Sequence, residues 1–169
     1  MRYFLIGFMG SGKTYWANQW GRSFHLPVFD LDEEIEKFTG KSIAAIFKEE
    51  GEDAFRKIER KVLHSFFKKD NLILSCGGGT PCFFNNMKEM NKNGVTIYLK
   101  STPRQLAQRL LSEKETRPLI KEVTDEMLES FITQKLNSRL EWYGQSMYHL
   151  QVEHINNDNF DKIKFRHER

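Results

Sequence analysis

The sequence has few of the residues that mark metal-binding and redox proteins. Only two of its 169 residues are cysteines, Cys76 and Cys82, and they lack the two-residue gap of zinc or redox pairs. We therefore expect both cysteines to be structural. The five histidines are scattered, and none stands at metal-ligand spacing from a carboxylate or a cysteine, so we assign them no chemistry.

Long apolar runs and a strong charge bias are also absent. The longest apolar runs, such as 3–7 and 72–76, fall far short of the ~20 residues that span a bilayer. The 26 Lys and Arg residues face 23 Asp and Glu residues, and the net charge of +3 is too small to indicate a nucleic-acid or membrane-surface partner. No signal-peptide cleavage site follows Met1. These absences favour a cytoplasmic protein with neither kind of partner.

The chain has no internal repeat, low-complexity tract or linker, and its length is that of one domain. Short apolar runs alternate with longer amphipathic segments, which predicts an α/β fold in which helices cover both faces of a parallel sheet. We expect five strands, at 3–7, 28–31, 72–76, 95–99 and 149–152. We expect helices at 13–23, 43–49, 53–68, 83–91, 103–111 and 125–144, and a last one that begins near Asp158. The polar segment 112–124, which contains Pro118, is expected to be an exposed loop.

A phosphate-binding motif follows the first expected strand. The segment "GFMGSGKT", from Gly7 to Thr14, matches G-x-x-x-x-G-K-[ST] and leads from a strand into a helix, as a phosphate cradle requires. Glycines let successive N–H groups turn inward, Lys13 neutralises phosphate charge, and the Thr14 hydroxyl can ligate Mg²⁺. An ordinary glycine-rich turn is the alternative. We predict ATP with Mg²⁺ as the donor, bound by residues Gly10, Ser11, Gly12, Lys13, Thr14 and Tyr15.

Two aspartates follow the second expected strand, in "FDLDEEIE". Asp30 and Asp32 alternate on an extended chain, so both carboxylates can face the γ-phosphate and its metal at the carboxyl end of the sheet. Equally, both can cap a helix that starts near Glu33. The spacing alone favours neither reading.

Two further features bear on the acceptor. Gly51 allows a sharp turn, after which Arg56 and Glu59 lie on one helix face, where they form either a carboxylate-binding pair or a surface ion pair. The run Gly77 to Gly79 follows an apolar strand. Three glycines there indicate a close approach of the backbone to a ligand, or else a tight turn without one.

Taken in order, these pieces resemble the shikimate kinase family. The resemblance covers residues 4–144 and includes the phosphate loop, Asp30-Leu31-Asp32, the segment from Phe47 to Glu59, the glycine run, "RPL" at 117–119 and "RLEWY" at 139–143. It implies a three-layer α/β/α P-loop kinase fold with a five-stranded parallel sheet and a mobile lid. It also implies a single domain over 1–169, with a lid at about 112–124 and an acceptor-binding region at about 32–60.

The resemblance also implies roles for individual residues. Asp32 would orient the acceptor hydroxyl and accept its proton, while Asp30 would act through the metal. Arg56 and Arg139 would grip the substrate carboxylate, and the backbone of Gly78 and Gly79 would line the acceptor pocket.

Two more arginines belong to the implied donor site. Arg117 would close with the lid against the transferring phosphate, although a lone arginine in a polar loop is more often a solvated charge. Arg109 is similar in position to an arginine that stacks on adenine. Glu59 is expected to fix the arginines or a hydroxyl rather than to act as the base.

The implied activity is the ATP-dependent phosphorylation of the 3-hydroxyl of shikimate by a monomer, in the biosynthesis of chorismate and the aromatic amino acids. Two alternatives stay open. A different small-molecule kinase, such as a gluconate-kinase-like enzyme, would turn over another acceptor faster than shikimate, and a non-catalytic nucleotide-binding module would bind ATP without acceptor-dependent release of ADP.

Overall fold

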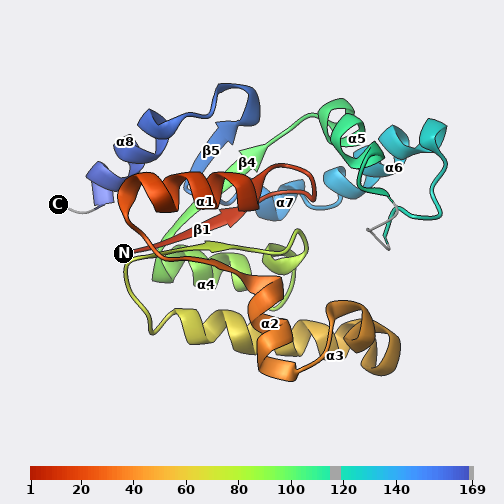
Figure 1. The fold of residues 1–169 in the computed structure, drawn as a ribbon, viewed down its shortest axis with the longest axis horizontal. Coiled ribbons are helices and arrows are strands. Elements are labelled where there is room, and N and C mark those ends of the chain that lie inside the picture. The colour runs from red at the N-terminus through yellow and green to blue at the C-terminus, as the bar shows by residue number, and fades with distance from the viewer. Residues whose placement is uncertain (115–118, 168–169) are drawn as a thin grey trace.

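The computed structural model describes residues 1–114 and 119–167, and within them one five-stranded sheet forms the centre of the molecule (Figure 1). Its strand order is β2-β3-β1-β4-β5, and every neighbouring pair is parallel. The strands are β1 (Arg2–Ile6), β2 (Val28–Asp30), β3 (Leu72–Ser75), β4 (Val95–Lys100) and β5 (Tyr148–Gln151). The predicted five-stranded parallel sheet is therefore confirmed. No strand begins or ends more than one residue from its expected position.

Alternate residues of the central strand enter two separate cores. Tyr3 and Leu5 pack on one face of the sheet with Trp20 and Phe160, whereas Phe4 and Ile6 belong to the core on the other face. Because successive side chains of a strand point to opposite faces, a strand buried on both sides is apolar throughout. This explains why β1 carries a continuous apolar run rather than an alternating one.

Helices cover both faces of the sheet, so the molecule has three layers (Figure 1). The first face is covered by α1 (Lys13–Phe24) and α8 (Asn157–His167). The other helices of the described residues are α2 (Leu31–Thr39), α3 (Ile43–Phe66), α4 (Asn86–Asn93), α5 (Pro103–Leu111), α6 (Asp125–Asn137) and α7 (Leu140–Tyr143). Two short 3-10 turns, η1 (Thr80–Cys82) and η3 (Val152–His154), follow β3 and β5.

Three helices differ from the sequence prediction. The helix expected at 125–144 is broken at Ser138 and Arg139 into α6 and α7, and Arg139 there has φ −113° and ψ −9°. The helix expected at 83–91 begins only at Asn86, since Phe84 and Asn85 have positive φ values. The helix expected near Glu33 begins at Leu31.

The sharp turn predicted at Gly51 is confirmed. Segments 43–49 and 53–68, expected as two helices, form one element, α3, that is interrupted where Gly51 adopts φ 82° and ψ 175°. A positive φ suits glycine because it has no Cβ. The second part of α3 therefore leaves Gly51 in a new direction and carries Arg56 and Glu59.

The strand order places a ligand site at one end of the sheet. The chain leaves the central strand β1 for β2 on one side, and β4 and β5 lie on the other side. In open α/β sheets, ligands bind at the carboxyl ends of the strands where the order changes direction. A ligand is therefore expected to bind at the loops that follow β1, β2 and β3.

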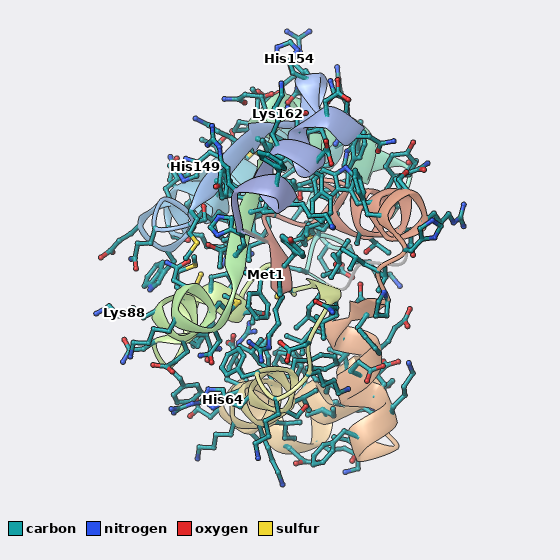
Figure 2. The ribbon with its side chains drawn as sticks, turned by 90° about the vertical axis from the view of Figure 1, so that its left-hand side faces the viewer. Met1, His64, Lys88, His149, His154 and Lys162 are labelled. Carbon is teal, nitrogen blue, oxygen red and sulfur yellow. The ribbon has the colours of Figure 1, made fainter. Side chains whose placement is uncertain are left out.

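The opposite end of the sheet carries Met1 and faces the viewer in Figure 2. His64, His149 and His154 lie far apart in this view. Within residues 1–114 and 119–167, no group of three or more His, Cys, Asp or Glu side chains surrounds a possible metal position. Over the same residues, no helix combines the length and the apolar character needed to cross a bilayer.

Candidate active site

The loop between β1 and α1 has the backbone of an anion cradle. Gly10 and Gly12 have φ values of 76° and 86°, in the left-handed region that costs glycine nothing. Among the described residues no side chain caps α1, so its N-terminus is a place where an anion can bind. Ser11 at the centre of the loop is buried, and its hydroxyl has no hydrogen-bond partner among the described atoms.

Lys13 folds back over this loop. Its ammonium group donates to the carbonyl oxygens of Gly7 at 3.0 Å and Phe8 at 2.9 Å. The positive charge is therefore fixed at the mouth of the cradle, where the outer phosphates of a bound nucleotide would lie.

Thr14 and Asp30 lie together beside the cradle. The Thr14 hydroxyl donates to Asp30 Oδ2 at 3.2 Å. Mg²⁺ prefers oxygen ligands and is commonly held by one or two carboxylates together with substrate phosphates. The hydroxyl and the carboxylate therefore have the chemistry to bind Mg²⁺, and their role as its ligands stays a prediction.

Asp32 occupies the next position towards the glycine run. Its Oδ1 lies 3.2 Å from the point that a Cβ on Gly77 would occupy. Its removal from bulk water and the negative charges of Asp30 and Glu59 raise its pKa to about 6, although Lys13 and Arg56 act in the opposite direction. A carboxylate with a pKa near neutrality is suited to accept a proton.

Arg56 is held by carboxylates on one side and by aromatic rings on the other. It donates to Glu59 Oε2 at 2.9 Å and to the more exposed Glu52 at 3.2 Å. Its guanidinium carbon lies 4.2 Å from the ring centre of Phe83 and 4.9 Å from that of Phe55. The pair is not a surface ion pair, because the side chain of Glu59 is only 1% exposed.

The glycine run provides space for these side chains rather than an unusual backbone. A Cβ on Gly79 would lie 2.5 Å from Arg56 Nη2, and one on Gly78 would lie 3.1 Å from Arg139 Nη1. None of the three glycines is among those with positive φ, and the segment ends in a turn at η1. In the structure the two arginines approach this run closely, and the approach of a ligand to it stays a prediction.

Arg139 reaches the same run from the break between α6 and α7. Its guanidinium carbon lies 5.2 Å from the ring centre of Phe8, in the phosphate loop. Tyr143, one turn later, donates from its hydroxyl to the carbonyl oxygen of Gly78 at 2.6 Å. The structure thus brings Arg56 and Arg139 to adjacent glycines, although they are 83 positions apart in the sequence.

One cavity of about 780 Å³ connects the phosphate loop with this region. Arg109 borders it and donates to the carbonyl oxygen of Gly10 at 3.2 Å, while Tyr15 lies at its edge with 59% of its surface exposed. The lining residues are Met9, Gly10, Gly12, Lys13, Thr14, Tyr15, Trp16, Asp30, Asp32, Ser75, Cys76, Gly77, Gly78, Arg109, Ser112, Glu113 and Val152. Arg139 adjoins this lining at Gly78, and Arg56 lies against Gly79, the next residue along the chain.

Arg117 lies outside the residues that the structure describes. Of the predicted lid at 112–124, the structure describes Ser112 to Lys114 and Leu119 to Thr124, and Ser112 and Glu113 line the cavity.

The sequence reasoning missed three residues that hold the site together. Phe83 packs its ring against Arg56, and Tyr143 donates to the carbonyl oxygen of Gly78. Thr80 donates from its hydroxyl to Glu59 Oε1 at 2.6 Å. The position of Thr80 directly after the glycine run was the only signal for it.

Cys76 and Cys82 are free thiols, and burial raises the pKa of Cys82 to about 11 and that of Cys76 as well.

Comparisons with known proteins agree with this geometry. The family model of shikimate kinase matches residues 9–164. A shikimate kinase of Bacteroides fragilis is 40% identical over 148 residues, which cover 88% of this chain and 83% of the relative.

The chain is also similar to solved structures of shikimate kinases. A shikimate kinase from Bacteroides thetaiotaomicron superposes with a TM-score of 0.90 at 34% identity, and the match covers 100% of this chain and 99% of the other. A shikimate kinase from Acinetobacter baumannii, in complex with shikimate, has a TM-score of 0.83 at 30% identity and covers 98% and 92% of the two chains.

Proposed function

Because the chain belongs to the shikimate kinase family, we propose that its cleft transfers the γ-phosphoryl group of ATP to the 3-hydroxyl of shikimate. The reaction is the ATP-dependent phosphorylation of shikimate, in the pathway to chorismate and the aromatic amino acids. The observation that carries the assignment is the meeting of Arg56 and Arg139 at Gly79 and Gly78, beside Asp32 and the phosphate loop.

The donor side binds the nucleotide through the backbone of the phosphate loop. The N-terminus of α1 and the ammonium group of Lys13 face the phosphates. Thr14 and Asp30 would hold Mg²⁺, which neutralises charge on the β- and γ-phosphates when bound. Arg109 borders the cavity at the place where the nucleotide base is expected.

The acceptor side binds an anion and a hydroxyl. Arg56 and Arg139 supply two planar guanidinium groups, and such groups match a carboxylate in a bidentate manner. A substrate held in this way presents its hydroxyl to Asp32. Asp32 accepts the hydroxyl proton while the oxygen bonds to the γ-phosphorus, and the bond to the β–γ bridging oxygen breaks to release ADP.

Most of the rate enhancement in phosphoryl transfer comes from positioning and charge neutralisation rather than covalent chemistry. The fixed Lys13, the paired arginines and Asp32 supply both. In this proposal Arg117 closes over the γ-phosphate with segment 112–124, and closure excludes the water that would compete as acceptor. We further infer that the enzyme is a cytoplasmic monomer formed by one domain, with an acceptor-binding region at about 32–60.

An ADP-release assay tests the proposed function. Shikimate, quinate, gluconate and nucleoside monophosphates are offered side by side with ATP and Mg²⁺. Shikimate is expected to give the highest kcat/KM by a wide margin. Faster turnover of gluconate would replace the proposal with a gluconate-kinase-like activity. ATP binding with no acceptor-dependent ADP release would indicate a non-catalytic nucleotide-binding module.

A further inference from the structure

Glu59 is the only charged side chain that is fully buried among residues 1–114 and 119–167. Each of its carboxylate oxygens has its own partner. Oε2 accepts from Arg56 Nη1 at 2.9 Å, and Oε1 accepts from the Thr80 hydroxyl at 2.6 Å. The second distance is that of a hydrogen bond to an ionised oxygen, which is shorter and stronger than one between neutral groups.

Thr80 is itself held rigidly. Its side chain is fully buried, its amide nitrogen donates to the carbonyl oxygen of Gly77 at 3.1 Å, and its carbonyl oxygen accepts from Asn86 Nδ2 at 2.9 Å. Its hydroxyl lies 3.1 Å from the position of a Cβ on Gly77. The hydroxyl therefore reaches Glu59 from a fixed turn, so the hydrogen bond fixes the carboxylate as well.

Arg56 has two acidic neighbours that compete for it. Glu59 holds it from the buried side, whereas Glu52 is 56% exposed and holds it from the solvent side at 3.2 Å. A buried carboxylate oxygen that loses its hydrogen-bond donor is strongly disfavoured. Without the Thr80 hydroxyl, Glu59 would lose its fixed orientation and Arg56 would turn towards Glu52, away from Gly79.

We propose that Thr80 is a positioning residue of the acceptor site: its hydroxyl orients Glu59, which in turn orients Arg56 for the substrate carboxylate. This inference rests on the proposed function and deepens it. Thr80 acts through two other side chains and does not touch the reacting atoms, so its effect falls on acceptor binding and not on the nucleotide.

Three variants test the proposal in steady-state assays. Thr80→Ala removes the hydroxyl without adding bulk, Thr80→Val replaces it with a methyl group, and Thr80→Ser retains it. We expect Ala and Val to raise the KM for shikimate at least tenfold, with a smaller change in kcat and a KM for ATP within twofold of the wild type. We expect Ser to restore the KM for shikimate to within about threefold of the wild type.

Thr96→Val is the matched control. Thr96 is also a fully buried threonine, but its hydroxyl donates to Asn91 and accepts from the Met147 amide, away from the cleft. This variant is expected to lower the melting temperature and leave the KM for shikimate unchanged. Thermal melts show whether each variant is folded, and Thr80→Ala carries the test alone if Thr80→Val does not fold.

The inference is overturned if Thr80→Ala keeps the wild-type KM for shikimate, if Thr80→Ser loses as much as Thr80→Ala, or if affinity for ATP falls equally. These outcomes are distinct from failure of the proposed function, in which the wild-type enzyme itself releases no ADP in response to shikimate.

Discussion

The hydroxyl of Thr14 donates to Asp30 Oδ2 at 3.2 Å, and this contact joins the first turn of α1 to the end of β2. The other oxygen, Oδ1, accepts from the amide of Asp32 at 3.0 Å and caps α2. The two readings of Asp30 that the sequence left open are therefore compatible, because each uses a different oxygen. One side chain can therefore cap a helix with one oxygen and, in the proposed function, offer the other oxygen to Mg²⁺.

The first prediction separates these two uses of Asp30. Asp30→Asn keeps an oxygen that can cap α2 but removes the charge, so the Mg²⁺ concentration for half-maximal activity should rise about tenfold or more at an unchanged melting temperature. Asp30→Ala removes both, and loss of the cap should cost a further ~1 kcal/mol of folding free energy. Mg²⁺ titrations and thermal melts measure the two effects. A melting temperature that falls equally in both variants would argue against the cap.

The second prediction concerns the pH dependence of catalysis. The pKa of Asp32 is raised to about 6, and the base form is the ionised one. The kcat/KM for shikimate should therefore be level above pH 7 and fall about tenfold per pH unit well below pH 6, since kcat/KM reports the free enzyme. Asp32→Asn should remove this limb and lower kcat by about 10²–10⁴-fold. A wild-type profile that stays flat down to pH 5 would exclude Asp32 as the base.

The third prediction follows from the same raised pKa. The folded protein binds a proton at Asp32 more tightly than the unfolded chain, whose ordinary value is 3.8. Ionised Asp32 thus destabilises the fold, and this cost disappears as the pH falls from about 6 to below 4. Asp32→Asn should melt at a higher temperature than the wild type at pH 8, and the difference should shrink over that window. Calorimetry at several pH values checks the sign.

The fourth prediction concerns Arg56. Arg56→Ala should raise the KM for shikimate by about 10²-fold or more, the loss typical of a buried charged contact, and leave ATP binding nearly intact. Arg60→Ala is the control, because Arg60 lies one turn later on α3, is exposed and packs over Phe84. Isothermal titration with each ligand measures both affinities. Equal loss of affinity for ATP and shikimate would contradict the assignment.

The sequence predicted the five strands and the glycine-rich loop between β1 and α1 because the signals for both are local. An apolar run indicates a buried strand, and the spacing from Gly7 to Thr14 indicates a phosphate cradle. The start of α5 also carries a local signal, because Thr102 and Gln105 form a capping box in which each side chain accepts a hydrogen bond from the backbone N–H of the other residue. The break between α6 and α7 could not be predicted, because residues 125–144 show one continuous helical pattern.

The acceptor side depends on contacts between distant segments, which no local pattern encodes. Nothing near Thr80 indicates that its hydroxyl reaches Glu59, 21 residues away. The sequence left open whether Arg56 and Glu59 form a surface ion pair or a carboxylate-binding pair. The burial of Glu59 excludes the surface pair, and burial is a property of the whole fold. Only the resemblance to a family placed Arg56 beside Arg139 before the structure did.

The last prediction concerns the glycine run. Gly79 has φ −90° and ψ −17°, which any residue adopts, so Gly79→Ala introduces no backbone strain. Its Cβ would lie 2.5 Å from Arg56 Nη2 and must displace the guanidinium. We expect the KM for shikimate to rise at least tenfold while the melting temperature changes little. Gly40→Ala is the converse case, because a Cβ there meets nothing within 4 Å but φ is 69°. That variant should lose about 1 kcal/mol of stability and keep its affinity for shikimate. If Gly79→Ala binds shikimate as the wild type does, the run does not serve to make room for Arg56.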